Sequence, residues 1–236
     1  MVIGGLIKQT LTDFPGKLAA IVFTQGCNFR CPYCHNPDLV LPECFDRVQP
    51  ITEKAFFSFL CRNKGLVEGV VVTGGEPTVQ KDLPEFIERL KTMGLAVKLD
   101  TNGTNYKRLE SLLERKLLDY VAMDLKAPLI LEDYQRIAGV RLSPNMMANI
   151  LESKDLLLQQ NIPYEFRSTL IRECHEPEDV VNIAEEIEGA RLYCLQQYAP
   201  EDALNVDFRK FTPYTIEEMN SFAGLICDKV NQVLVR

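Results

Sequence analysis

The sequence predicts a single α/β domain over residues 1–236, built on an open parallel sheet. Apolar, β-branched runs alternate along the chain with stretches of helical periodicity, which is the pattern of repeated strand and helix units. There are six such units, too few to close an eight-stranded barrel. An open barrel or a doubly wound sheet therefore remains. Polar residues also gather where the expected strands end, at the edge where parallel α/β folds place their ligands.

The expected strands are short runs rich in Val, Leu and Tyr. They lie at 19–24, 69–73, 96–100, 120–125, 164–171 and 191–197. Amphipathic helices are expected at 52–63, 82–93, 106–115, 145–160 and 177–187, with a final helix over 215–235. Asp82 and Glu85 have the spacing of a capping box, and Pro84 lies in the first turn between them.

Composition and charge exclude several classes of protein. With 46% hydrophobic residues the chain has enough apolar side chains for a substantial core. The net charge is -7 and no basic cluster is present, so neither nucleic acid nor an anionic membrane is expected as a main partner. The first residues lack the pattern of a signal peptide, and no later segment approaches about 18 consecutive apolar residues. We therefore expect a cytoplasmic protein.

Three cysteines follow one another closely after the first expected strand. Cys27, Cys31 and Cys34 have the spacing C-x3-C-x2-C, and thiolates at this spacing select zinc, copper(I) or an iron-sulfur cluster. Zinc would need His35 as its fourth ligand, but adjacent residues rarely both reach one tetrahedral ion. A cluster held by three cysteines leaves one iron without a protein ligand. The other cysteines are expected to be packing residues or incidental surface thiols: Cys44, Cys61, Cys174, Cys194 and Cys227.

Two further motifs follow the second and third expected strands. In GGEP the glycines at 74 and 75 permit close approach of the backbone, and Glu76 offers a carboxylate. In DTNG, which begins at residue 100, the side chains offer both donors and acceptors. A simple turn is the alternative for GGEP, and a helix cap with a turn is the alternative for DTNG.

The sequence CNFRCPYCHNP resembles the signature of the radical S-adenosylmethionine superfamily. The longer stretch LTDFPGKLAAIVFTQGCNFRCPYCHNPDLV resembles the activating enzymes of glycyl radical proteins, and most of all the anaerobic ribonucleoside-triphosphate reductase activating proteins. With GGEP and DTNG the resemblance covers residues 3–126 and is looser beyond them. It implies an open, partial (β/α)6 barrel of the TIM type in a single radical SAM domain.

The resemblance also implies a chemistry. Cys27, Cys31 and Cys34 would hold a [4Fe-4S] cluster whose free iron is chelated by S-adenosyl-L-methionine. Reductive cleavage of that cofactor would give a 5'-deoxyadenosyl radical, which would abstract hydrogen from a glycine of a partner protein. The implied partners are a glycyl radical protein, namely an anaerobic ribonucleotide reductase, and an electron donor such as flavodoxin or ferredoxin.

The resemblance assigns further residues to cofactor binding. Tyr33 would pack near the adenine, and Glu76 with its two preceding glycines would bind the ammonium of the methionine moiety. The remaining candidates would contact the ribose, a small cation, the carboxylate or the substrate: Asp100, Thr101, Asn102, Asp124, Lys126, Arg167 and Gln197. Each also has a local alternative, because isolated polar groups are often satisfied by their own neighbours. For Asp124 and Lys126 that alternative is an ion pair or a solvated surface position.

Two other functions remain open. One is a radical enzyme that acts on a small molecule, such as a deazapurine synthase, and the other is a non-enzymatic iron-sulfur electron carrier. A carrier would not require GGEP and DTNG. Residues 36–73 hold no second cluster motif and no substrate domain follows Lys126, which favours the activating enzyme.

Overall fold

The computed structural model describes residues 1–236, and its strands follow one another in the order β1 to β8. Their bounds are β1 (Ile3–Thr10), β2 (Ala19–Thr24), β3 (Gly69–Gly74), β4 (Ala96–Thr101), β5 (Tyr120–Asp124), β6 (Tyr164–Leu170), β7 (Tyr193–Gln197) and β8 (Val233–Val235). β1 is antiparallel to β2, whereas β2 with β3, β3 with β4, β6 with β7 and β7 with β8 are parallel pairs. The sheet is mostly parallel and open, which confirms the predicted fold class, and β2 to β7 are the six expected strands.

Helices connect most of the strands. They are α1 (Pro37–Val40), α2 (Glu53–Arg62), α3 (Leu83–Thr92), α4 (Tyr106–Glu114), α5 (Leu131–Ala138), α6 (Pro144–Leu158), α7 (Pro177–Glu186) and α8 (Ile216–Leu225). Helices α2, α3, α4, α6 and α7 are confirmed within two residues of the expected bounds. No helix combines the length and the apolar character that crossing a membrane requires.

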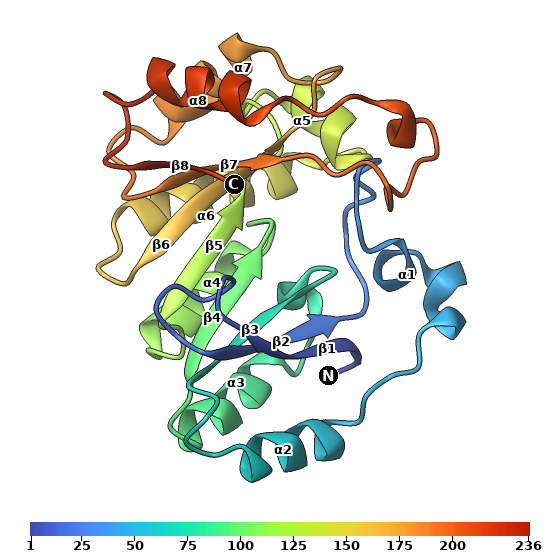
Figure 1. The fold of residues 1–236 in the computed structure, drawn as a ribbon. Helices are drawn as coiled ribbons and strands as arrows, with labels where there is room; N and C mark the ends of the chain where they lie inside the picture. The colour runs from blue at the N-terminus through green and yellow to red at the C-terminus, as the bar shows by residue number, and fades with distance from the viewer. The chain divides into compact units, whose positions relative to one another are not determined.

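The chain divides into two compact units, and the first contains β1 to β4. It comprises Met1–Asn28, Asp38–Thr101 and Lys107–Val121. Helices α2 and α3 lie along one side of these strands (Figure 1). Phe56 of α2 stacks on Phe86 of α3 with ring centres 5.7 Å apart, and both rings are buried. The three central valines of β3 are wholly buried, as expected for a parallel strand covered on both faces.

The second unit contains the parallel strands β6, β7 and β8. It comprises Phe29–Pro37, Asn102–Tyr106 and Ala122–Arg236. Helix α8 packs against β7 and β8 and beside α7 (Figure 1). Phe166 of β6 and Tyr193 of β7 are wholly buried, so this unit has a core of its own.

The expected final helix over 215–235 is wrong in its second half. Helix α8 ends at Leu225, and Val233–Val235 forms β8 instead. The edge of β7 supplies the backbone partners: Tyr193 N–H donates to the Gln232 carbonyl at 2.9 Å, and Arg236 N–H to the Leu195 carbonyl at 3.0 Å. Valine-rich residues suit such a ladder better than a helix.

The expected capping box at the start of α3 is also wrong. Asp82 precedes the helix, but its side chain makes no capping hydrogen bond. Its carboxylate is instead paired with the amino group of Met1, which also pairs with Glu53. A charged partner from a distant part of the chain has therefore replaced the local cap.

Besides β8, the sequence did not predict β1, α1 or α5. β1 contains Gly4 and Gly5, which lower strand propensity, yet it pairs with β2 through a register that shifts twice. Helix α5 is short, and its significance lies in its contact with the cysteine loop.

Replacing Thr215 with Ala should lower the free energy of unfolding by about 1 kcal/mol, as loss of an N-cap does. The Thr215 hydroxyl accepts from the Glu218 N–H at 3.2 Å, and the Glu218 carboxylate accepts from the Thr215 N–H at 2.7 Å. Urea denaturation measures the loss. Ser221→Ala, at an exposed position of the same helix, is the control and should change little. Equal losses in the two variants would contradict the cap.

Candidate functional site

The loop after β2 carries the three motif cysteines, none of which is in a disulfide. Cys27 belongs to the first unit, and Cys31 and Cys34 belong to the second. The Cys34 N–H donates to the Cys31 carbonyl at 3.0 Å, which closes a tight turn between them. The Asn36 N–H donates to the Cys34 sulfur at 3.4 Å. The turn thus holds two thiols in place and gives one of them a backbone donor.

The end of α5 packs against this loop. Arg30 N–H donates to the Ala138 carbonyl at 2.9 Å. Gly139 follows with φ 66°, and a Cβ at this position would lie 2.0 Å from the Arg30 carbonyl oxygen. Both the left-handed backbone and this contact require glycine. The Phe29 ring meets Tyr134 of α5 edge-on, with ring centres 6.4 Å apart. Helix α5 therefore helps to position the cysteine turn.

Burial favours the protonated thiol at Cys31 and at Cys34 when no metal is bound. It raises the pKa of Cys31 to about 11, although Lys126 acts in the opposite direction. Burial also raises the pKa of the Cys34 thiol. Metal binding replaces the proton of a thiol with a cation and so removes the cost of a buried negative charge. This donor set fits a soft metal centre.

The GGEP motif ends β3 against the chain that follows β2. Gly75 N–H donates to the Thr24 carbonyl, and Glu76 N–H donates to the Gly26 carbonyl, both at 2.9 Å. A Cβ on Gly75 would lie 2.0 Å from the Gly26 carbonyl oxygen. Gly74 has φ 114°, where a side chain is strained. The two glycines therefore allow β3 to approach the chain that follows β2, while an approach of this backbone to a cofactor stays a prediction.

Glu76 links the GGEP and DTNG motifs. Its side chain is 1% exposed, and Oε1 accepts from the Thr78 N–H at 3.1 Å and from the Thr78 hydroxyl at 2.6 Å. The hydroxyl of Thr101, the last residue of β4, donates to the same oxygen at 2.7 Å. The structure thus brings Glu76 and Thr101 together. The role of Glu76 toward an ammonium group stays a prediction.

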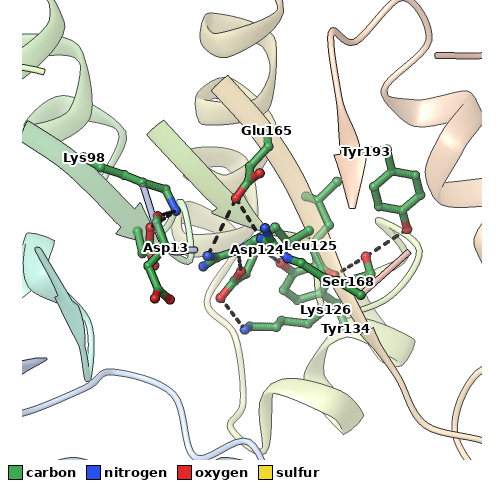
Figure 2. A network of polar contacts seen from close by, with 12 residues as sticks. Asp13, Lys98, Asp124, Leu125, Lys126, Tyr134, Glu165, Ser168 and Tyr193 are labelled. Atoms are coloured by element: carbon green, nitrogen blue, oxygen red, sulfur yellow. Dashed lines mark hydrogen bonds and ion pairs between the residues drawn. The ribbon is translucent and has the colours of Figure 1, made fainter. Parts of the chain in front are cut away.

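Asp100 lies beside a buried lysine that sequence analysis missed. Lys98 is 2% exposed; its Nζ donates to the Asp13 carbonyl at 2.7 Å and lies 3.3 Å from Asp100 Oδ1 (Figure 2). It also lies 5.4 Å from the centre of the Tyr120 ring. A buried ammonium is costly unless its donors are satisfied, so these contacts constrain Asp100 as well. Within the run AVKLD nothing distinguished this lysine from an ordinary strand residue.

Asn102 forms a local turn. Its Oδ1 accepts from the Thr104 N–H at 3.1 Å and from the Thr104 hydroxyl at 2.6 Å. This is the turn that was the local alternative for DTNG. A contact from Asn102 to a ribose stays a prediction.

The carboxylate of Asp124 lies between two cations at the end of β5. Oδ1 accepts from Arg167 Nε at 2.8 Å and Oδ2 from Lys126 Nζ at 2.9 Å (Figure 2). Burial would raise the pKa of Asp124, but Arg167 and Lys126 outweigh it and hold the pKa well below its ordinary value. Burial would lower the pKa of Lys126, but the Asp124 carboxylate raises it well above the usual range. These three side chains therefore stay ionised and carry one net positive charge.

Arg167 also approaches a second carboxylate that the sequence did not single out. Glu165 of β6 is 1% exposed, and its Oε1 lies 3.9 Å from Arg167 Nη1 (Figure 2). The same oxygen accepts from Arg236 Nη2 at 3.0 Å. Arg167 is thus held between Glu165 and Asp124.

Tyr33 lies against Lys126, whose Nζ is 5.8 Å from the centre of the ring. The side chain is 6% exposed, and its buried hydroxyl has no hydrogen-bond partner. Burial raises the pKa of this hydroxyl well above its ordinary value. Leaving such a group unsatisfied costs about 1–3 kcal/mol, so a polar atom of a ligand would be stabilised here.

Gln197 is not brought to the Asp124 group. It ends β7 as an exposed residue, and its Nε2 donates to the Tyr214 carbonyl at 2.7 Å. A contact of Gln197 with cofactor or substrate stays a prediction.

His175 supports Lys126 and was also missed. Its Nδ1 accepts from the Ile171 N–H at 3.1 Å, so the proton is on Nε2, which lies 2.9 Å from the Lys126 carbonyl oxygen. The Tyr214 hydroxyl donates to the His175 carbonyl at 2.6 Å. Burial lowers the pKa of the ring and keeps it neutral. The one sequence signal was a histidine just beyond a strand end.

These residues fit the two expected cofactors. Cys31 and Cys34 are not in disulfides and have the donor chemistry of an iron-sulfur cluster. The ring of His35, the residue that zinc would need, is stacked on Tyr198 with centres 6.0 Å apart. The net positive charge around Asp124 suits a carboxylate, and the unsatisfied Tyr33 hydroxyl suits a polar ligand.

The chain is similar to several known proteins. Residues 21–159 match the family model of the radical SAM superfamily. A relative from Methanocaldococcus jannaschii, provisionally named a glycyl-radical enzyme activating enzyme, is 32% identical over 99% of this chain and 95% of its own length. A protein from Thermococcus kodakarensis named a GTP 3',8-cyclase is 29% identical over 81% of this chain and 60% of its own length.

The fold resembles that of a solved structure. The crystal structure of Streptococcus suis SuiB superposes with a TM-score of 0.68 over 92% of this chain and 48% of SuiB. Sequence identity is 13%, so the match supports the fold class alone.

Gly75→Ala should lower the free energy of unfolding by about 2 kcal/mol, because its Cβ would overlap the Gly26 carbonyl oxygen. Gly224→Ala is the matched control: it adds the same methyl group to α8, where no atom lies within 4 Å. It should be neutral or stabilise by up to about 1 kcal/mol. Urea denaturation compares them, and similar behaviour of the two variants would refute the close approach.

The protein should lose stability as the pH falls below the ordinary histidine pKa of 6.5. The folded pKa of His175 is lowered by burial, so below pH 6.5 the unfolded chain binds a proton that the folded chain excludes. His175 thus stabilises fully above pH 6.5, and this contribution is lost as the pH drops toward the folded pKa. Urea unfolding from pH 8 to 5.5 measures the slope, which should be smaller in His175→Gln; an unchanged slope would exclude His175 as its source.

Proposed function

This chain belongs to the radical SAM superfamily, whose cofactors are a [4Fe-4S] cluster and S-adenosyl-L-methionine, and we propose that it generates a glycyl radical on a partner protein. The observation that carries the proposal is the 32% identity to the M. jannaschii relative over almost the full length of both chains. When bound, the reduced cluster and S-adenosylmethionine supply a 5'-deoxyadenosyl radical, which takes the hydrogen atom.

The chain's own residues bind and orient the cluster and the cofactor. In this proposal Cys27, Cys31 and Cys34 are the cluster ligands. Lys126 attracts the cofactor carboxylate, because Asp124 keeps the lysine ionised while Arg167 leaves the group a net positive charge. Tyr33 would gain a partner for its buried hydroxyl.

The polar strand ends of the first unit complete the cofactor contacts in this proposal. Glu76 is fixed by Thr78 and Thr101 and offers a buried carboxylate to the ammonium group. The backbone at Gly75 lies against the Gly26 carbonyl, which fixes the start of the GGEP turn. Asp100 and Asn102 would serve the ribose or a small cation.

The partner is proposed to be an anaerobic ribonucleotide reductase, which the resemblance of the segment around the cysteines supports. Flavodoxin or ferredoxin would donate the electron. A cytoplasmic location belongs to the same proposal, since none of the eight cysteines is in a disulfide and thiols persist in a reducing compartment.

A small-molecule substrate is the second candidate. It is favoured by the match to the GTP 3',8-cyclase, which covers 81% of this chain. That match is less extensive and lower in identity than the one to the activating enzyme.

Anaerobically reconstituted protein should hold about four iron and four sulfide, as one thiolate-bound cluster requires. Cys27→Ala, Cys31→Ala and Cys34→Ala should each lose the cluster. Cys61→Ala, which removes an exposed thiol, and Cys44→Ala, which removes a buried one, should retain it. Iron and sulfide analysis measures this, and full iron content in the three motif variants would refute the ligand assignment.

Mixing the reduced enzyme, S-adenosylmethionine and an anaerobic ribonucleotide reductase should produce a doublet electron spin resonance signal. The doublet should collapse when the reductase glycine carries deuterium at Cα, because the splitting comes from that hydrogen. Cys31→Ala enzyme is the negative control. If the reductase gives no signal but deuterium from a small metabolite appears in 5'-deoxyadenosine, the small-molecule function replaces the proposed one.

A further inference from the structure

A segment late in the chain contacts the cysteine turn through its backbone. We name residues 198–211, which follow β7, the strap. Leu204 N–H donates to the Cys34 carbonyl at 3.0 Å, and Asn205 N–H donates to the Pro32 carbonyl at 2.8 Å. Apart from a single 3-10 turn, Phe208–Lys210, the strap has no regular structure. Both N–H groups therefore donate hydrogen bonds to the loop that carries Cys31 and Cys34.

The strap has a conformation of its own that presents these donors. The Tyr198 hydroxyl donates to the Phe208 carbonyl at 3.0 Å, and this bond joins the first residue of the strap to its 3-10 turn. The Asp207 N–H donates to Asn205 Oδ1 at 2.9 Å, and Arg209 Nε donates to the Ala203 carbonyl at 2.9 Å. These internal bonds support the loop that presents the N–H groups of Leu204 and Asn205.

Few side chains anchor the strap to the rest of the second unit. Ala203 is wholly buried and Tyr198 is 2% exposed, with its ring stacked on His35. Val206, by contrast, is 63% exposed. The backbone hydrogen bonds therefore carry much of the contact between the strap and the cysteine turn.

We propose that the strap positions the cysteine turn for cluster binding, with Leu204 and Asn205 as positioning residues. Their N–H groups bind the carbonyls of Pro32 and Cys34, so they restrain the peptide planes that precede Tyr33 and follow Cys34 and thereby the backbone of the turn. The end of α5 fixes the turn from its other end, at Arg30. This positioning role rests on the proposed cluster ligands. It assigns a function to two residues that are not themselves ligands.

The test separates the backbone donor of Asn205 from its side chain. Asn205→Pro removes the N–H, whereas Asn205→Ala keeps the N–H and removes only the side-chain bond to Asp207. Val206→Pro controls for introducing proline next to the same position. Each protein is reconstituted anaerobically, and the rate of iron loss to a chelator is followed by absorbance.

Asn205→Pro should release iron about fivefold faster than the wild type, the factor expected from one lost hydrogen bond. Asn205→Ala and Val206→Pro should stay within about twofold of the wild type. The electron spin resonance spectrum of the reduced cluster should broaden in Asn205→Pro alone, which a general loss of stability would not produce. If Asn205→Pro releases iron at the wild-type rate, or if Asn205→Ala is equally fast, the positioning role is wrong.

Hydrogen exchange of the wild type tests the proposal even if Asn205→Pro does not fold. The amides of Leu204 and Asn205 should exchange at least about tenfold more slowly in the cluster-loaded protein than in the iron-free protein, because the cluster fixes the carbonyls that accept from them. Equal rates would overturn the proposal. If the wild type assembles no cluster, the proposed function is wrong as well. If the cluster is normal but the exchange rates are unchanged, only the positioning role of the strap is wrong.

Discussion

The ion pairs of Asp124 hold together the carboxyl ends of β5 and β6. Arg167 reaches this carboxylate from β6, and the backbone of Leu125 donates to the Arg167 carbonyl at 2.8 Å. Ser168 then donates to the Leu125 carbonyl, and Tyr193 of β7 donates to Ser168 (Figure 2). The cations are partly buried, so loss of the Asp124 charge would leave Lys126 without its carboxylate partner and Arg167 with Glu165 alone. This single carboxylate therefore links the polar ends of β5 and β6 in the second unit.

Local sequence was sufficient to predict a helix or strand wherever the element's own residues determine its structure. The run GVVVT is too apolar and β-branched to be anything but a buried strand, and it became β3. β8 could not be predicted in this way, because Val233–Val235 is a strand only through the open edge of β7. The failed cap at Asp82 has the same cause, since the amino group of Met1 reaches it from 81 residues away.

The candidate site was predictable in its positions and not in its partners. The rule that polar side chains follow parallel strands located Glu76, Thr101 and Asp124. It did not show that Glu76 accepts from two threonines or that Gln197 donates to Tyr214. The hydrogen-bond partners of these side chains come from different elements of the fold. They can be identified only when the positions of those elements are known.

The strap also sets an order of events during biosynthesis. The cysteine turn leaves the ribosome early, whereas Leu204 and Asn205, which cap its carbonyls, are made only after most of the chain. At translation rates of about 5–20 residues per second, this interval lasts roughly 10 seconds or more. During that time the carbonyls of Pro32 and Cys34 lack the N–H donors that they have in the folded protein. The final backbone of the cysteine turn therefore forms only after residues 204 and 205 have been made.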